Sequence, residues 1–395
     1  MSEANQVEIS YQAEAAGQFG IAVPENAKRE LRYNSESLVA NINDEDSPEI
    51  SSDRQFFDVI PLGSSFGGDI PTSLSHGNLD DLLPSAFFNP WTDISISGDA
   101  NLAVAAGVYT DTASGFGALK VGDRVRTEGF PAAANANGWK TVTAVADDGS
   151  TVTLSPPGPN TAAGNGRSIK SSNLKNGKTR HSFSIEKKFS ALDPLIQHNY
   201  IGCLVQGMAM EFRAGASVTA NLTVSAQKHA QVSGPNAAVF NPMRTPAPKN
   251  LIFSPADTKG LQVGPADSLH VPDTVVLSAI TMNLGNNLRS LQQLGTLDIG
   301  DIRPGRFSVE GSLEMYFSDG GLYDRFLARQ ETEVSWRTVE PNSDNIYYFD
   351  MPRVRVRNAR IVAGGVDTDL TAQFDYRALG HRTRGYTFMM TKNAA

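Results

Sequence analysis

The feature that most constrains the fold of this chain is a strict alternation of apolar and polar residues. Three segments, 218–226, 307–317 and 366–374, place apolar side chains at every second position and polar ones between them. This pattern is typical of strands with one face packed on a core and the other in water. Helical periodicity is confined to two short segments, 77–88 and 320–328. The sequence therefore predicts a mainly β protein with short helices against its sheets.

The two short helices are expected to pack on the sheets through their apolar side chains. These are Leu79, Leu82 and Leu83 in the first helix and Leu322, Phe326 and Leu327 in the second. We expect Pro84 to cut the first helix short, because proline inside a helix removes a backbone hydrogen bond.

Internal repetition is the second constraint. Two segments read as strand, turn and helix with Ser-Leu and Leu-x-Asp in the same order, and two later segments also resemble each other. Matches in the same order predict one fold present twice in tandem. The matched segments are 67–87 with 306–328, 205–215 with 354–364, and 218–226 with 366–374.

Composition divides the chain further. Residues 92–170 are rich in Ala, Gly, Thr and Asn with frequent turn signals, which predicts a small β-barrel or sandwich domain inserted into a loop. The predicted fold is thus two tandem β-sandwich or barrel modules, each with a flanking helix, plus this inserted domain. The predicted boundaries are 1–34 for an N-terminal arm that reaches a neighbouring subunit, 35–91 and 171–232 for the first module, 233–272 for a Pro-rich linker, and 273–395 for the second module.

Charge and cysteine content exclude several classes of function. The 395 residues include 34 Lys+Arg and 42 Asp+Glu, and the net charge of −8 argues against binding nucleic acid by neutralising phosphates. The one cysteine, Cys203, excludes an intramolecular disulfide and is expected to be a buried, inert thiol. The six histidines lack metal-ligand spacing, so no metal or cofactor is expected. No apolar run reaches the ~18 residues that span a bilayer, so no membrane association is expected.

Candidate catalytic motifs fail on inspection. Gly177-Lys178-Thr179 ends like a phosphate-binding loop, but Ser172 stands where that pattern requires glycine. Asp80 and Asp81 are adjacent on a helix and point apart, which favours a role at the helix start over acid–base chemistry. The sequence therefore predicts a protein that is not an enzyme.

Two charge patterns remain. Arg353, Arg355 and Arg357 alternate along one strand, and their acidic surroundings favour an ion-pair face between subunits over a nucleic-acid stripe. The next strand carries three carboxylates on its polar face, and residues 44–46 are also acidic. These groups form either an ordinary solvated face or the wall of a negatively charged passage. The three strand carboxylates are Asp367, Asp369 and Asp375.

Several short motifs resemble the tail tube proteins of long-tailed bacteriophages. The resemblance covers most of the chain outside the predicted insert. The motifs that carry it are Arg32-Tyr33 within 31–38, Asp53-Arg54-Gln55 within 49–55, Leu79-x-Asp-Leu-Leu83, Gly311-Ser-Leu313 and Leu322-Tyr-Asp-Arg-Phe326.

This resemblance implies a structural protein of the virion tail, assembled in the host cytoplasm. Family members form rings whose inner sheets make a continuous wall, and the rings stack into a tube that delivers the genome to the host. Two modules per chain would imply a trimeric, pseudo-six-fold ring, with a homo-hexamer as the alternative. The implied partners are further copies of the chain, a tape-measure protein, a tail terminator and distal tail proteins. DNA would pass through the lumen, past Asp367, Asp369 and Asp375, without specific binding.

A second class of function stays open. The 92–170 domain would decorate the outside of such a tube, or would serve a surface adhesin or glycan-binding tail component. The adhesin alternative predicts a protein that does not polymerise and has an exposed aromatic platform near Trp91 or Trp139. A glycan array separates these two classes.

Overall fold

The computed structural model is mainly β, as predicted, with two short α-helices among the residues it describes. The described residues are 6–21, 28–50, 52–98, 102–113, 115–131, 133–234, 244–266, 277–316, 321–363 and 369–393. Within these ranges no helix has both the length and the apolar character that a bilayer crossing requires.

The strands form two series, here called the first and second repeat, with a group of strands inserted into the first. The first repeat comprises β1 (Val7–Ala13), β2 (Arg29–Glu30), β3 (Val39–Asp46), β4 (Val59–Ser73), α1 (Leu83–Phe87), β12 (Phe183–Phe189), β13 (Ile196–Arg213), β14 (Thr219–Ala226) and β15 (Lys228–Ser233). The second comprises η4 (Pro255–Asp257), β16 (Thr258–Pro265), β17 (Leu277–Gly285), β18 (Arg289–Gln292), β19 (Ile299–Arg303), β20 (Ser308–Tyr316), α3 (Gly321–Leu327), β21 (Thr332–Val339), β22 (Ile346–Ala363), β23 (Leu370–Ala378) and β24 (Met389–Lys392).

The pairing of the strands repeats along with their order. In the first repeat β1 pairs with β12, β12 with β13, β13 with both β14 and β15, β14 with β4, and β4 with β3. In the second, β16, β21, β22, β23, β24, β20 and β17 make the same pairings in the same roles. The register shifts also occur at corresponding places. β12 shifts register against β13 between Phe183 and Ile185, and β21 shifts against β22 between Thr332 and Val334.

The observed register corrects the residue matches that the sequence suggested. Val205 faces Val224 just before a register shift, and Val356 faces Tyr376 just before the corresponding shift. Val205 therefore corresponds to Val356 and not to Val354. The strand at 218–226 corresponds likewise to 370–378 and not to 366–374. An alternating pattern looks the same after a slip of two residues, so sequence comparison alone could not fix the register.

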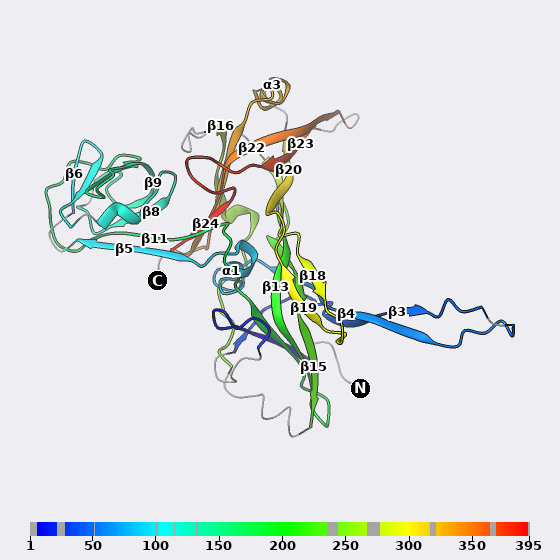
Figure 1. The fold of residues 1–395 in the computed structure, drawn as a ribbon. Coiled ribbons are helices and arrows are strands. Elements are labelled where there is room, and N and C mark those ends of the chain that lie inside the picture. The colour runs from blue at the N-terminus through cyan, green and yellow to red at the C-terminus, as the bar shows by residue number, and fades with distance from the viewer. Residues whose placement is uncertain are drawn as a thin grey trace.

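Two strands of 18 residues, β13 and β22, connect the layers of the fold (Figure 1). Their N-terminal halves pair with β12 and β15, or with β21 and β24, in the outer layer. Their C-terminal halves belong to one continuous sheet, because β13 also pairs with β17 and so joins the two repeats. This joined sheet has the order β3, β4, β14, β13, β17, β20, β23, β22. The main core lies behind it and includes Ile70, Met210, Met282, Trp336 and Phe349.

The two helices follow β4 and β20, the corresponding strands of the two repeats. Leu79, Leu82 and Leu83 are buried, but only residues 83–87 are α-helical, and Pro84 stands in the first turn of α1. Our expectation for Pro84 was wrong, because a proline there loses no helical hydrogen bond and favours helix initiation.

The helix after β20 differs from expectation at its end. Leu322 is buried and Phe326 is packed against the core, as residues four apart share a helix face. Leu327 turns away from that face and is 61% exposed, so its expected packing was wrong.

Two predicted connecting segments contain strands of the repeats. The expected N-terminal arm includes β1, whose Ile9 and Tyr11 are buried beside β12. The expected linker at 233–272 includes β16, which pairs with β21 and buries Val263. β1 alternates apolar and polar residues from Val7 to Ala13, a signal that our prediction of an arm did not use. β16 offers only Leu261 and Val263 within its Pro-rich surroundings. These segments therefore belong to the layers of the fold.

The inserted strands form a separate β unit (Figure 1). They are β5 (Thr92–Gly98), β6 (Leu102–Ala105), β7 (Val108–Asp111), β8 (Arg124–Glu128), β9 (Gly138–Val145), β10 (Thr151–Ser155) and β11 (Arg167–Lys175), with a short 3-10 turn, η3 (Gly115–Ala118). Their buried side chains, including Tyr109, Phe116 and Val142, form a cluster distinct from the main core. β11 also pairs with β24, which fixes this unit to the second repeat.

The separate core of the inserted unit predicts that it loosens on its own. We expect Phe116→Ala to cost ~3–5 kcal/mol of stability in that unit, because it removes a fully buried ring. Hydrogen exchange measured by mass spectrometry should accelerate within 94–169 and stay unchanged in 196–226. Phe349→Ala, in the main core, is the matched control and should produce the reverse pattern. Equal acceleration of both regions by Phe116→Ala would contradict two separate cores.

Candidate assembly interface

The joined sheet has a polar face that points away from the core. Rows of polar residues cross it: Glu211 lies opposite Thr281, Thr281 opposite Ser312, and Ser312 opposite Asp375. The same face is hollowed by a depression of about 490 Å³ that crosses β4, β14, β13 and β17. This surface can accommodate a hydrated polar object without burying apolar groups.

The charges on this polar face are largely paired. The Arg213 guanidinium lies 2.7 Å from a Glu211 oxygen and 3.2 Å from a Glu314 oxygen, and these hydrogen bonds raise the pKa of Arg213. Arg377 lies 3.2 Å from Glu310. The face therefore carries ion pairs that the sequence did not reveal, because their members come from three different strands.

Of the three predicted channel carboxylates, the structure describes two. Asp375 lies on the polar face and accepts a hydrogen bond of 3.2 Å from Asn358. Asp369 is exposed just before β23. Asp367 lies outside the described residues.

The three predicted interface arginines all have acidic partners in their own chain. Arg353 binds Glu331 through two nitrogens at 2.6 and 2.7 Å, and Arg355 lies 2.9 Å from the same carboxylate. These hydrogen bonds lower the pKa of Glu331. Arg357 lies 3.9 Å from Glu310. Since the side chains of Arg355 and Arg357 remain about half exposed, both can still meet a further carboxylate.

The joined sheet ends in two strands that pair on one side only among the described residues. β3 pairs with β4, and β22 beyond Val354 pairs with β23. Val39 on one edge, and Ile361 and Val362 on the other, are exposed apolar side chains. An exposed edge with apolar side chains is a template for pairing with another chain.

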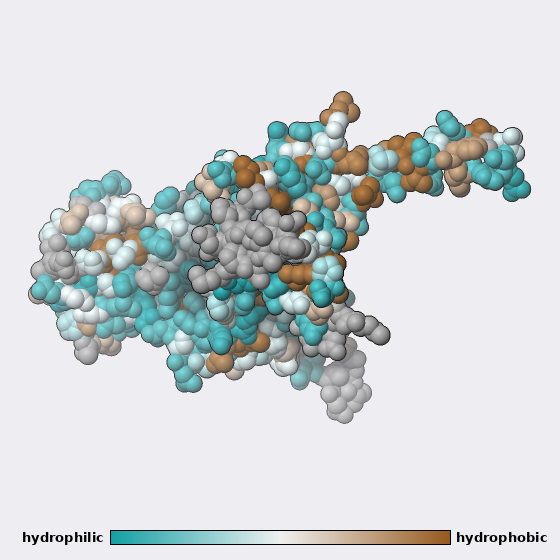
Figure 2. All heavy atoms as spheres, turned by 90° about the horizontal axis from the view of Figure 1, so that it is seen from below, coloured by the Kyte–Doolittle hydropathy of each residue, from teal (hydrophilic) through white to brown (hydrophobic). Residues whose placement is uncertain are grey.

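Strands β3 and β4 form a long projecting hairpin, residues 39–73, whose distal part, 41–65, extends beyond the joined sheet (Figure 1). Figure 2 shows apolar side chains along this projection among polar ones. The exposed apolar residues are Val39, Ile42, Ile50, Phe56, Phe57, Val59, Ile60 and Leu62. A contiguous exposed apolar surface of this kind is typical of an interaction site. The sequence contained a signal, the apolar residues at 56–62, which lie beside the Asp53-Arg54-Gln55 motif.

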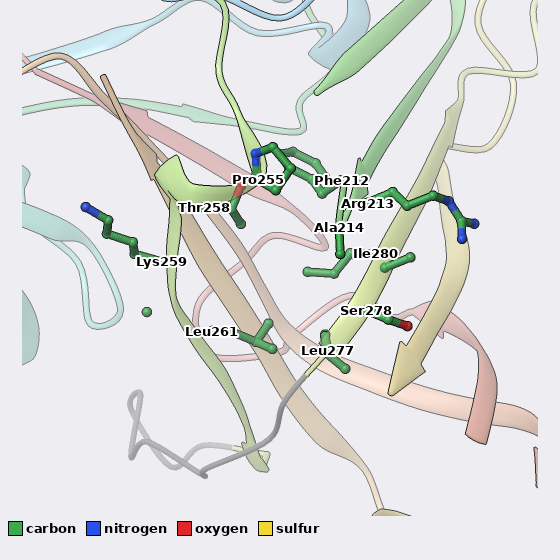
Figure 3. Close-up of a pocket in the computed structure, with 12 residues that line it drawn as sticks. Phe212, Arg213, Ala214, Pro255, Thr258, Lys259, Leu261, Leu277, Ser278 and Ile280 are labelled. Atoms are coloured by element: carbon green, nitrogen blue, oxygen red, sulfur yellow. The ribbon is translucent and has the colours of Figure 1, made fainter. Parts of the chain in front are cut away.

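A cavity of about 230 Å³ opens between the end of β13, the start of β17 and β16 (Figure 3). Phe212, Leu261 and Leu277 line it, whereas the charged ends of Arg213 and Lys259 point away from it in opposite directions. Its lining includes no carboxylate, imidazole or thiol. Its polar lining residues, Thr258, Lys259 and Ser278, have no carboxylate or imidazole beside them in the cavity that could act as their partner.

The other chemistry-bearing residues have structural partners. Cys203 is fully buried, and burial raises the pKa of its thiol. Asp80 accepts hydrogen bonds from Tyr347 and Lys392, while Asp81 binds Arg29 at 2.7 Å, so the two carboxylates serve different neighbours. Among the described residues, no group of three or more His, Cys, Asp or Glu could hold a metal ion.

Two histidines far apart in sequence meet on the outer layer. His198 Nδ1 and His229 Nε2 are 3.2 Å apart, on the neighbouring strands β13 and β15. Phe189, Tyr200 and Phe66 pack around them. Burial lowers the pKa of both imidazoles, assisted by Lys187 at His198 and by His198 itself at His229. Sequence spacing could not show this contact, since it depends on strand register.

The comparisons with known proteins agree with this architecture. The family model described as "Phage tail tube protein" matches residues 4–378, nearly the whole chain. No curated protein sequence matches it.

The histidine pair predicts a loss of stability in mild acid. Because the folded-state pKa of both groups is depressed, the unfolded chain binds more protons below the ordinary value near 6.5, and the unfolding free energy falls as pH falls. We expect His229→Phe, which keeps an aromatic ring, to flatten this dependence between pH 7 and 5 by up to ~1.4 kcal/mol per pH unit. Denaturant unfolding across this pH range measures the slope. A slope equal to that of the parent chain would contradict the prediction.

Proposed function

Because the chain belongs to the phage tail tube protein family, we propose that it forms stacked rings of a tail tube that conducts the phage genome into the host. It is a structural protein of the virion tail. The observation that carries the proposal is the joined sheet, which has a polar, hollowed face and, among the described residues, a strand at each end that pairs on one side only. Closing several copies edge to edge would remove both exposed edges and turn the polar face inward.

We propose three chains per ring, with a homo-hexamer as the alternative. Support comes from the repeated topology, since the joined sheet already contains two equivalent sets of strands in one chain. Three chains would supply six such sets and a pseudo-six-fold wall. The implied partners are the neighbouring rings, a tape-measure protein, a tail terminator and distal tail proteins.

The polar face of the joined sheet is proposed to line the channel. Its carboxylates, including Glu211, Glu310 and Asp375, would repel DNA phosphates. Arg213 and Arg377 on this face are paired with Glu211 and Glu310. Paired arginines leave little attraction for a passing phosphate chain. Asp367 and Asp369 are proposed to add to this surface near the start of β23.

The projecting hairpin is proposed to make the contacts between stacked rings. Its exposed Phe56, Phe57 and Ile60 would be covered by an adjacent ring, which removes apolar surface from water. The inserted unit is proposed to decorate the outside, because it is fixed to β24 in the layer opposite the joined sheet.

The adhesin alternative rests on the same inserted unit. Its expected aromatic platform has little support, because Trp91 donates a hydrogen bond to the Asp80 carbonyl and lies beneath Lys392. Trp139 packs against Tyr348 of the second repeat, with ring centres 5.1 Å apart. A glycan array remains the direct test of this alternative.

The stacking proposal predicts that charges on the hairpin block tube growth. We expect Phe56→Asp combined with Phe57→Asp to leave folding unchanged, since both rings are exposed, and to yield separate rings in place of tubes. Negative-stain microscopy and sedimentation velocity distinguish rings from tubes. Leu294→Asp is the matched control, because Leu294 is fully exposed outside the hairpin, and this variant should form tubes. Normal tubes from the double variant would contradict the role of the hairpin.

The decoration proposal predicts that the inserted unit is dispensable for assembly. Ile96 and Ile169 lie opposite each other on β5 and β11, so an Asn-Gly turn in place of 97–168 can close the remaining stem. This change keeps the pairing of β11 with β24. We expect tubes with a smaller outer diameter in micrographs. Failure of a folded trimmed chain, verified by circular dichroism, to form tubes would contradict decoration.

A further inference from the structure

Among the described residues, one antiparallel ladder pairs a strand of the first repeat with a strand of the second in the joined sheet. It runs from Gly207 opposite Gly285 to Arg213 opposite Ala279, between β13 and β17. At its centre Met210 lies opposite Met282, and both side chains are almost completely buried, with exposures of 2% and 0%. This ladder, here called the joint, shows in which register an edge strand of one repeat pairs with an edge strand of the other.

Each strand of the joint has a counterpart at a free edge of the joined sheet. β22 is the counterpart of β13, since Val205 and Val356 precede the same register shift against β14 and β23. Counting on past the shift matches Met208 to Ala359 and Met210 to Ile361.

The other counterpart of the joint is found through a pair of glycines. Gly68 faces Val224, and Gly311 faces the corresponding Tyr376. A Cβ added to Gly68 would lie 2.3 Å from the Ser37 carbonyl oxygen, and one added to Gly311 would lie 1.9 Å from that of Thr281. The same close approach identifies Ser37 with Thr281, and hence β3 with β17.

We propose that β22 of one chain pairs with β3 of a second copy in the register of the β13–β17 joint. The register places Ala359 opposite Ala40, Arg360 opposite Val39, and Ile361 opposite Leu38. This inference rests on the proposed ring and specifies how its chains are joined. The ring then has one kind of joint, made within each chain and again between chains.

The exposure of the edge residues supports this pairing. Ile361 is 38% exposed, whereas Met210, its counterpart in the completed joint, is 2% exposed. Val39 and Val362 are also exposed apolar residues on the two edges. A second copy in this register would cover these side chains and satisfy the unpaired backbone groups beside them.

The charges beyond the ladder are complementary. In the existing joint the backbone N–H of Asn286 donates to the Gln206 carbonyl at 2.8 Å, which continues the register by one step. In the proposed pairing of β22 with β3, the equivalent step places Arg357 opposite Ile42. Two residues further along the same register, Arg355 lies opposite Asp44. The exposed acidic run 44–46 of one chain thus approaches the half-exposed arginines of the next.

Engineered disulfides test the register directly. In a Cys203→Ala background, we expect Val39→Cys combined with Arg360→Cys to crosslink neighbouring chains on mild oxidation, because residues directly opposite in an antiparallel pair have disulfide-compatible Cα separations. The pair Ala40→Cys with Arg360→Cys is the matched control. Its side chains fall on opposite faces of the sheet and should not crosslink. Non-reducing gels should show a ladder that ends at the closed ring, which also counts the chains.

Microscopy of the same reduced variants separates the two levels of the proposal. Rings or tubes that crosslink through the control pair, or through neither pair, would overturn the register and leave the ring standing. A parent chain that forms no rings under assembly conditions would overturn both the register and the proposed function.

Discussion

Backbone hydrogen bonding at the edges of the joined sheet is the constraint on which the architecture depends. Each buried N–H and C=O needs a partner, and a sheet satisfies these groups everywhere except along its outermost strands. Both halves of β13 have a strand on each side. The N-terminal half lies between β12 and β15 in the outer layer, and the C-terminal half lies between β14 and β17 in the joined sheet. Within the described part of the chain, only the N-terminal half of β22 has a strand on each side, namely β21 and β24. Among the described residues its C-terminal half pairs only with β23, and this difference between two otherwise equivalent strands is the basis of the proposed pairing between chains.

The repeats are alike in topology but differ in what they attach to it. In the first, β3 and β4 continue outward as the projecting hairpin. In the second, the connection between β17 and β20 folds back as the β18–β19 pair, and the Leu297 carbonyl accepts a hydrogen bond of 2.6 Å from Ser64 at the base of that hairpin. The second repeat therefore braces the hairpin of the first. A ring of three such chains would have a nearly six-fold wall but only three projecting hairpins.

The sequence predicted where strands occur better than it predicted which strands pair and in which register. Alternation at 307–317 and 218–226 was long enough to predict the fold class, and the order of the matched segments suggested a tandem repeat. Alternation could not fix register, because a two-residue slip preserves the pattern. β1 carries the same alternation from Val7 to Ala13, but over only seven residues of a segment that we expected to be an arm. Side-chain contacts that depend on strand pairing could not be predicted from the sequence. The His198–His229 contact and the Arg213 ion pairs are examples. The free edges were equally hidden, since they are defined by the strand that is missing beside them.

Buried charged groups lie where the inserted unit meets the second repeat, whereas backbone hydrogen bonds connect the strands of the joined sheet. Arg384, buried between the unit and the second repeat, lies 3.1 Å from Glu333 and 3.8 Å from Asp350, and Asp350 also accepts a hydrogen bond from Tyr386. Nearby, Lys175 of β11 lies 2.5 Å from Asp123. Buried charges contribute little net stability, but removing one partner costs ~3–5 kcal/mol, so separating the unit from the second repeat would be costly. In the proposed ring the joined sheet would gain backbone hydrogen bonds from a second chain, whereas this junction already has its partners within one chain, so assembly at the edges would leave the inserted unit in place.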